Sequence, residues 1–455
     1  MEKKETEKKK KKPNLNLTEL IPEMIDLSHE HANKRMMIND KENQNTVSLP
    51  DDLIPLILVR LPVRSLLRFK SVCKSWLSLI SNTQFAKSHF DLAAAPTHRL
   101  LLKRINVGSE IQSLDFEASL RDDSAVVNLK FPPYSAPFYL ALGSCRGLIL
   151  LAKMMGPSAG DLIVWNPSNS FHREIQVTYG YDDWDSWYDP SSTRVRQGIP
   201  PYVGCFLTGF LYGFGYDQSR DDYLLVLLRF GRHEPQPQAF EHSREGLLVC
   251  MTTGGPEVTT FSRPRVEVLS VKTNVPSFIY GEEFEYVELG SASASGLFLN
   301  KSLHWLVKSK ATGLHVIIAF DLVERSLFEI PLTPDLTQEL ATLKIYHLRV
   351  LGGCLGLCCN GAGVDHGMTE IWVMKEYRVQ SSWTRYFVLP EYYFLPICFI
   401  EGGGVFGSNN SGRFEKFDDN GELLEDHTYG QENEDVFGYF DMYKETLLTL
   451  PGELS

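Results

Sequence analysis

The spacing of apolar residues changes twice along the chain and divides it into three stretches. Residues 1–46 are polar and rich in Lys, Glu and Asn, with a short apolar period only near residues 17–27. Such a stretch buries too little apolar surface to fold, so we predict a mostly disordered tail over 1–46. Residues 47–93 show helical spacing, and residues 97–450 show the spacing of short strands.

Apolar residues in the second stretch predict a small unit of three helices. One stripe consists of Leu53, Ile54, Ile57, Leu58 and Leu61. Residues 50–52, Pro-Asp-Asp, suit a helix start, and Pro62 closes the stripe. Between residues 69 and 80 the large apolar side chains fall at i, i+3, i+4, i+7 and i+11. That spacing predicts a continuous helix with one buried face.

The third stretch consists of short runs rich in Val, Ile, Phe, Tyr and Trp, separated by clusters of Gly, Asn, Asp and Pro. A unit recurs five times: a Gly-punctuated pair of apolar strands, then a strand in which an aromatic residue commonly precedes Asn or Asp. The copies occupy residues 143–167, 212–270, 296–322, 351–375 and 403–418. A period of roughly 50 residues with about four strands per unit predicts a β-propeller of six or seven blades.

Two further features concern the predicted propeller. The run 440–450 is expected to add a strand to the first blade and close the ring, which removes an exposed sheet edge. Trp165, Trp305 and Trp372 recur at matching positions of the repeat, so we interpret them as a structural layer inside the blades. The fold class is therefore α+β multidomain, with a small helical unit followed by an all-β, propeller-like domain.

An irregular acidic segment at 181–189 holds the candidate substrate-binding residues. Trp184, Trp187 and Tyr188 do not recur in the repeat, and aromatic residues in such loops are typical interface anchors. The alternative is a loop that folds onto the propeller surface. The segments 179–201 and 231–262 are both expected to be surface loops.

Charge and composition narrow the classes of function. The chain of 455 residues carries a net charge of −12, but residues 1–12 hold seven Lys against three Glu, which leaves about −16 for the rest. An acidic body argues against nucleic-acid binding, which needs Lys and Arg to neutralise phosphates. No signal peptide and no membrane-spanning run is found, so we expect the cytoplasm or the nucleus. The basic run 8–12 is either a nuclear-import signal or a solvated tail.

Candidate catalytic and metal-binding motifs were considered and rejected. Residues 143–147, Gly-Ser-Cys-Arg-Gly, match a nucleophile elbow in form, but a strand follows where the elbow needs a helix, so we predict a tight turn. The candidate zinc ligands are Cys354, Cys358, Cys359, His347 and His366. No pair of cysteines there has ligand spacing, and reduced core thiols are the better interpretation. We therefore predict no catalytic residue, no metal and no cofactor.

Residues 49–76 resemble the F-box in nearly every position that defines this motif, from Leu-Pro-Asp-Asp-Leu at 49–53 to Ser-Val-Cys-Lys-Ser-Trp at 71–76. Pro-Leu at 55–56 departs from it and affects only the first helical turn. Residues 97–450 resemble the F-box-associated interaction domain of plant F-box and F-box/kelch-repeat proteins. They share its order of motifs, such as Trp-Asn-Pro at 165–167 and Tyr-Gly-Phe-Gly-Tyr-Asp at 212–217.

The resemblance implies a substrate-recognition subunit of an SCF-type ubiquitin ligase. The F-box, over 47–93, would bind a Skp-type adaptor and, through it, a cullin and a RING subunit. The domain over 97–450 would hold an unknown protein target for ubiquitination and proteasomal degradation. The adaptor-binding residues so implied are Leu49, Pro50, Leu53, Ile57, Leu58, Leu61, Pro62, Val63, Leu66, Leu67, Phe69, Val72, Cys73, Lys74 and Trp76.

Physical reasoning supports a docking role for this small unit. About 45 residues cannot hide so many apolar side chains, so an exposed apolar face for a partner is expected. The alternative is that these residues pack against the propeller. Two other functions are left open. One is a ligase-independent scaffold, and the other is a pollen S-locus F-box protein that recognises stylar ribonucleases, because residues 442–451 resemble the ending of those F-box proteins. A propeller enzyme would need clustered His, Asp or Glu at the inner positions of the blades, and none stands out.

Overall fold

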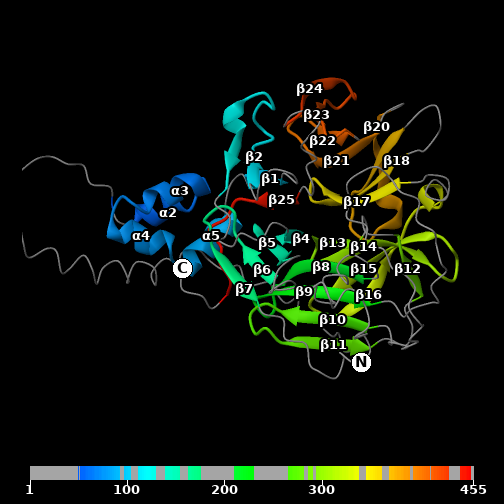
Figure 1. Cartoon of the computed structure of the whole chain (residues 1–455), viewed down its shortest axis with the longest axis horizontal. Helices are drawn as coiled ribbons and strands as arrows, with labels where there is room; N and C mark the ends of the chain where they lie inside the picture. The colour runs from blue at the N-terminus through cyan, green and yellow to red at the C-terminus, as the bar shows by residue number, and fades with distance from the viewer. Residues whose placement is uncertain are drawn as a thin grey trace, which may run out of the picture. The chain divides into compact units, whose positions relative to one another are not determined.

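The computed structural model describes residues 50, 52–92, 97–103, 111–129, 139–153, 162–175, 210–229, 265–280, 285–289, 294–337, 345–360, 368–389, 393–409, 411–429 and 441–451 (Figure 1). The predicted tail over 1–46 lies outside these residues. The chain divides into two compact units, Met1–Ala94 and Ala95–Ser455, and each is described by itself. Among the described residues, no helix has the length and apolarity needed to cross a membrane.

The described part of the first unit contains four short helices, so the prediction of three helices is wrong. They are α2 (Leu53–Leu58), α3 (Val63–Phe69), α4 (Lys74–Ile80) and α5 (Thr83–Leu92). Their core is formed by the buried side chains of Leu58, Val63, Leu66, Ile80 and Phe85. His89 Nε2 lies 2.8 Å from the Leu61 carbonyl oxygen and so joins α5 to the turn between α2 and α3.

The continuous helix predicted over residues 69–80 is wrong. Helix α3 ends at Phe69, and α4 begins at Lys74. Between them Cys73 is extended, and its sulfur accepts the Trp76 backbone N–H at 3.5 Å, which caps the new helix. The break leaves Val72 58% exposed, so the apolar positions of the pattern do not share one buried face.

The described part of the second unit contains four separate four-stranded antiparallel sheets. One of them has β4 (Tyr139–Cys145), β5 (Leu148–Lys153), β6 (Leu162–Trp165) and β7 (His172–Ile175). The next has β17 (Ile345–Leu351), β18 (Cys354–Asn360), β19 (Thr369–Met374) and β20 (Trp383–Leu389). Another has β21 (Phe394–Phe399), β22 (Val405–Asn409), β23 (Phe414–Phe417) and β24 (Leu423–His427). The sheet that contains the first strand of the unit, which we call the first sheet, has in spatial order β25 (Asp441–Lys444), β1 (His98–Lys103), β2 (Ile111–Leu114) and β3 (Val126–Asn128).

The remaining strands form a single nine-stranded sheet, so the prediction of six or seven separate blades is wrong. Its main path is β11 (Pro276–Tyr280), β10 (Arg265–Ser270), β9 (Asp222–Arg229), β8 (Phe210–Asp217), β13 (Ser295–Leu299), β14 (Ser302–Ser309), β15 (His315–Asp321) and β16 (Ser326–Ile330). Strand β12 (Tyr286–Glu288) pairs with β14 beside this path. The structure is propeller-like, with four separate four-stranded sheets and one fused sheet.

Two glycines explain the fusion. Strands β8 and β13 pair in parallel, with Gly213 opposite Gly296. A Cβ atom on Gly296 would lie 2.5 Å from a ring carbon of Trp305, whose indole N–H donates to the Tyr212 carbonyl at 3.0 Å. Because the glycines carry no side chains, the two strands approach closely over this ring. The Tyr212 N–H also donates to the Ala294 carbonyl at 2.8 Å.

The prediction that the C-terminal run adds a strand to the first blade is confirmed. Strand β25 pairs antiparallel with β1, and the Glu445 N–H continues the pairing by donating to the Thr97 carbonyl at 2.8 Å. A buried ion pair lies beside this seam: Arg99 Nε donates to Glu445 Oε1 at 2.7 Å. Arg99 Nη2 also lies 3.0 Å from Asp115 Oδ2. The seam therefore combines strand pairing with a charge network.

The repeated motifs have different roles in different sheets. Trp165 is fully buried at the end of β6, and Asn166 after it donates its side-chain N–H groups to the Thr446 and Leu448 carbonyls at 3.0 and 2.8 Å. This Trp-Asn motif thus holds the C-terminal segment. Trp165 on β6 and Trp372 on β19 both lie on the third strand of a four-stranded sheet. Trp305 lies instead on β14, within the nine-stranded sheet, so the prediction of matching positions is wrong for Trp305.

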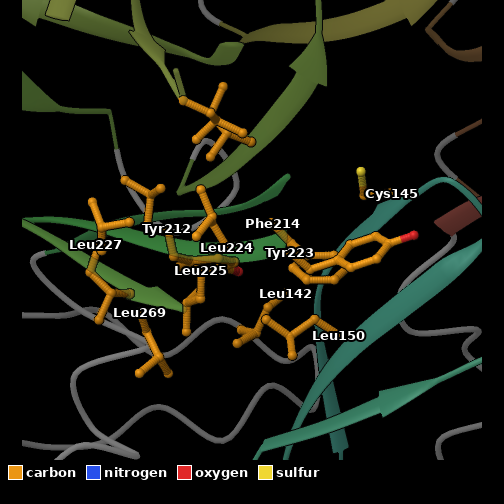
Figure 2. Close-up of a cluster of buried hydrophobic side chains, with 14 of the residues drawn as sticks. Leu142, Cys145, Leu150, Tyr212, Phe214, Tyr223, Leu224, Leu225, Leu227 and Leu269 are labelled. Carbon is orange, nitrogen blue, oxygen red and sulfur yellow. The ribbon is translucent and has the colours of Figure 1, made fainter. Parts of the chain in front are cut away.

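Apolar contacts between sheets form the core of the second unit. Figure 2 shows one cluster, in which Leu142 and Leu150 of the sheet β4–β7 lie near Phe214 and Tyr223 of the nine-stranded sheet. The rings of Phe214 and Tyr223 are stacked with centroids 5.6 Å apart. Neighbouring sheets are therefore packed face to face, as in propeller blades.

Candidate functional site

The surface of the helical unit carries exposed apolar side chains. Leu53 and Ile57 of α2 are 43% and 45% exposed, and one helical turn separates them on the same face. Val72 between α3 and α4 is 58% exposed, and Leu77 of α4 is 46% exposed. We call these four side chains the apolar row. Neighbouring exposed apolar side chains on a small unit are typical of a site where another protein binds.

The implied adaptor-binding residues differ in burial. Pro50, Leu53, Ile57, Pro62, Val72, Cys73 and Lys74 are exposed, Leu61, Leu67, Phe69 and Trp76 are half-buried, and Leu58, Val63 and Leu66 are buried. Leu49 lies outside the described residues. The three buried side chains form the core beneath the surface, and the other eleven described residues are accessible to a partner.

The break between α3 and α4 shapes part of this surface. The rings of Phe69 and Trp76 meet edge to face across it, with centroids 5.4 Å apart. The Ser71 hydroxyl donates to the Arg68 carbonyl at 2.7 Å and ends α3. The thiol of Cys73 is exposed while its sulfur caps α4. The turn is therefore held in place while Val72 points outward.

Charge on the helical unit is opposite in sign to that of the whole chain. Residues 52–92 contain six basic side chains, Arg60, Arg64, Arg68, Lys70, Lys74 and Lys87, against Asp52 and Asp91. The chain as a whole carries −12. Partial burial lowers the pKa of Lys70 from its ordinary value. A partner surface that complements this unit would combine apolar side chains with negative charge.

The predicted substrate-binding residues of the second unit, Trp184, Trp187 and Tyr188, lie outside the described residues. The same is true of the two irregular segments predicted as surface loops, 179–201 and 231–262. Their predicted roles therefore stay predictions.

The elbow-like motif at 143–147 forms a turn between two strands, as predicted. It connects β4 to β5, with Arg146 and Gly147 at φ of 53° and 84°. A Cβ atom on Gly147 would lie 2.3 Å from the Lys444 carbonyl oxygen, so glycine is needed for close contact with the C-terminal segment. Cys145 is buried, and burial raises the pKa of its thiol well above the ordinary value.

The cysteines among the candidate zinc ligands lie on β18. Cys358 and Cys359 are buried, and burial raises the pKa of the Cys358 thiol to about 12. Burial also lowers the pKa of His347 to about 4. No group of three or more potential ligands is arranged to hold a metal ion within the described part of the chain, and His366 lies outside it.

Fold and surface together define a class of protein: a small helical unit with an exposed apolar row, linked to a propeller-like β domain. Comparison with known families agrees with this. Residues 47–88 match the F-box domain, and residues 97–414 match the F-box associated beta propeller domain. The chain belongs to the family of plant F-box proteins that carry this F-box-associated domain.

Proteins of Arabidopsis thaliana are similar to this chain over most of its length. An F-box/kelch-repeat protein is 26% identical over 357 residues, covering 75% of this chain and 80% of its own. The F-box protein CPR1 is 27% identical over 349 residues, covering 75% of this chain and 73% of its own. Among solved structures, prolyl oligopeptidase B from Galerina marginata covers 86% of this chain and 54% of its own at 11% identity. Its TM-score of 0.31 is too low to carry an argument.

Proposed function

We propose that this protein is the substrate-recognition subunit of an SCF-type ubiquitin ligase. F-box domains generally bind Skp1-type adaptors, and the family consists of substrate-recognition proteins that are generally non-catalytic. The adaptor links the helical unit to a cullin and a RING subunit. The propeller-like domain holds a protein target, which is ubiquitinated and then degraded in the cytoplasm or the nucleus.

The observation that carries this proposal is the apolar row on the F-box unit. Complete burial of a leucine or isoleucine side chain contributes about 1.5–3 kcal/mol. Leu53 and Ile57 are almost half exposed, so a partner that covers them gains about 1 kcal/mol from each. The neighbouring basic residues favour an acidic partner surface. These features support a protein interface on the helical unit.

The proposed mechanism is proximity. A subunit that binds both the adaptor and the target raises the effective concentration of the target's lysines near the ubiquitin-loaded enzyme. Bringing reactants together in this way converts an encounter in solution into a step within one complex. Such a mechanism assigns no bond-making role to any residue of this chain.

The test changes the two exposed residues of α2. We expect the double variant Leu53→Asp, Ile57→Asp to bind an immobilised Skp-type adaptor from Arabidopsis thaliana at least about 100-fold more weakly than the unaltered chain. The reason is that apolar burial is lost and two carboxylates are placed in an apolar contact, a combined cost of about 3 kcal/mol or more. Biolayer interferometry on the full chain gives the dissociation constants.

A matched control places the same charges on exposed apolar positions of the β domain. Val275 and Leu314 are 60% and 40% exposed, and Val275→Asp with Leu314→Asp should leave adaptor binding within about threefold. Unchanged circular dichroism spectra establish that both variants are folded. The proposal fails if the unaltered chain does not bind the adaptor, or if the α2 variant binds as well as the control.

A further inference from the structure

The outer strands β20 and β24 both contain a bulge that carries an exposed apolar side chain. In β20, Tyr386 falls between the pairs Ile371–Phe387 and Trp372–Arg385 and is 43% exposed. In β24, Leu424 falls between the pairs Lys416–Glu425 and Phe417–Leu423 and is 60% exposed. Bulges redirect side chains and are common beside functional sites at sheet edges. Leu423, next to the second bulge, is 51% exposed.

Contacts between the two sheets place Tyr386 of β20 beside the turns that precede β22 and β24. The Tyr386 ring lies 4.6 Å from the Phe399 ring, and its hydroxyl donates to the Gly403 carbonyl at 3.3 Å. A Cβ atom on Gly403 would lie 3.6 Å from the Tyr386 hydroxyl and 3.7 Å from the Asp419 Cβ. Similarly, a Cβ atom on Gly421, in the turn before β24, would lie 3.6 Å from Leu389 on β20.

Acidic side chains surround this apolar surface. Glu401, Asp419 and Glu422 are exposed, and none of them forms an ion pair with a residue that the structure describes. Hydrogen bonds from the backbone of the same turn lower the pKa of Asp418, which keeps this carboxylate ionised. We call Tyr386, Leu423, Leu424, Glu401, Asp419 and Glu422 the rim patch.

Nearby basic side chains already have acidic partners. Arg385 lies 3.1 Å from Glu370, and Lys416 lies 3.2 Å from Glu425. Arg413 forms an ion pair with Asp426. The negative charge of the rim patch is therefore not neutralised by these three side chains, and the complementary ligand is positively charged.

Strand β20 also offers a backbone edge. It is the last strand of its sheet, and in the part of the chain that the structure describes it pairs only with β19. An extended segment can add to such an edge through main-chain hydrogen bonds while its side chains contact neighbouring pockets and charges.

We propose that the rim patch binds an extended protein segment in which Lys or Arg lies next to apolar residues. The charge of the patch selects the basic residues, and Tyr386 with the two leucines covers the apolar ones. That the segment belongs to the protein target of a ubiquitin ligase rests on the function proposed above. The binding chemistry itself depends only on the described residues.

The test uses three short fluorescein-labelled peptides and the full chain. One alternates Lys with Leu and Tyr, the second has Glu in place of Lys, and the third has Ser in place of the apolar residues. We expect measurable binding, by fluorescence anisotropy, only for the first peptide, weakening as salt is raised. Binding of all three peptides with equal affinity, or of none, would overturn the proposal.

Variants locate the binding on the chain. Asp419→Asn with Glu422→Gln should weaken binding about tenfold and reduce its salt dependence, because two exposed charge pairs are lost. Leu423→Ser with Leu424→Ser should also weaken it about tenfold. The control Glu324→Gln with Glu376→Gln removes two exposed acidic residues elsewhere and should change affinity less than twofold. Unchanged affinity in both patch variants would overturn the proposal.

Adaptor binding, measured on the same variants, separates this inference from the proposed function. Retained adaptor binding without peptide binding refutes only the rim patch, and peptide binding without adaptor binding refutes only the ligase role. The chain's own Lys-rich residues 8–12 provide a competing occupant. If the peptide binds only after these lysines are changed to Gln, the tail is the occupant and the proposal is wrong.

Discussion

The ion pair between Arg99 and Glu445 allows a quantitative test of how much the pairing of β25 with β1 contributes to stability. Both side chains are almost fully buried, at 5% and 7% exposure, and their contact joins residues 346 positions apart. Changing Glu445 to Ala would leave the Arg99 guanidinium buried with Asp115 as its one remaining carboxylate partner among the described residues.

The expected loss of stability follows from this geometry. Removing one partner of a buried ion pair costs about 3–5 kcal/mol, because the other charge stays buried without compensation. Asp115 keeps part of that compensation, so we expect Glu445→Ala to lower the free energy of unfolding by about 2–3 kcal/mol. The comparison is Arg121→Ala: Arg121 is 70% exposed and lies 3.4 Å from Asp426, so its loss should cost less than about 1 kcal/mol.

Urea unfolding followed by tryptophan fluorescence measures both variants at one pH and salt concentration. A further variant, Arg99→Met with Glu445→Leu, removes both charges and should recover most of the lost stability, because apolar residues can replace a buried pair. The reasoning would be refuted if Glu445→Ala cost no more than Arg121→Ala, or if the double variant were less stable than Glu445→Ala.

Two further predictions concern the fused sheet. Gly296→Ala should lower the free energy of unfolding by about 3 kcal/mol or more, because the added methyl overlaps Trp305. The control Gly313→Ala, at φ of 69° with open space around it, should lower it by only about 1 kcal/mol. The midpoints of urea unfolding measure both changes. Burial lowers the pKa of His304 from 6.5 to about 4, so the folded state binds fewer protons than the unfolded state between these values. Stability should therefore fall by about 3 kcal/mol as the pH drops through this window. His304→Gln should reduce that fall in pH-dependent unfolding, leaving a contribution from His347, and an unchanged pH profile would contradict the assignment.

The strands could be predicted from the sequence because their apolar runs and turn residues are local signals. All five predicted repeats coincide with strands, and the closing strand at the C-terminus was anticipated. The number of blades could not be predicted, because periodicity does not say which strand lies next to which. Gly213 and Gly296 lie near the starts of the second and third repeats, but only their pairing reveals the fused sheet.

The binding surfaces could be predicted less well. Composition indicated an excess of apolar residues on the helical unit, but the outward position of Val72 depends on the cap that Cys73 provides to α4. The rim patch was missed entirely. Its bulges at Tyr386 and Leu424 come from register shifts between paired strands, which have no signal in either strand alone. The Asp-Asp-Asn-Gly turn at 418–421 was the one visible hint.

Closure of the first sheet by β25 has a consequence for the synthesis of the protein. Arg99 leaves the ribosome 346 residues before Glu445, which at about 5–20 residues per second is a delay of roughly 17–70 seconds. During this time the edge of β1 has no partner strand from the C-terminus, because the strands of the other sheets are still being translated. The unpaired edge of β1 is therefore open to edge-to-edge association until β25 emerges.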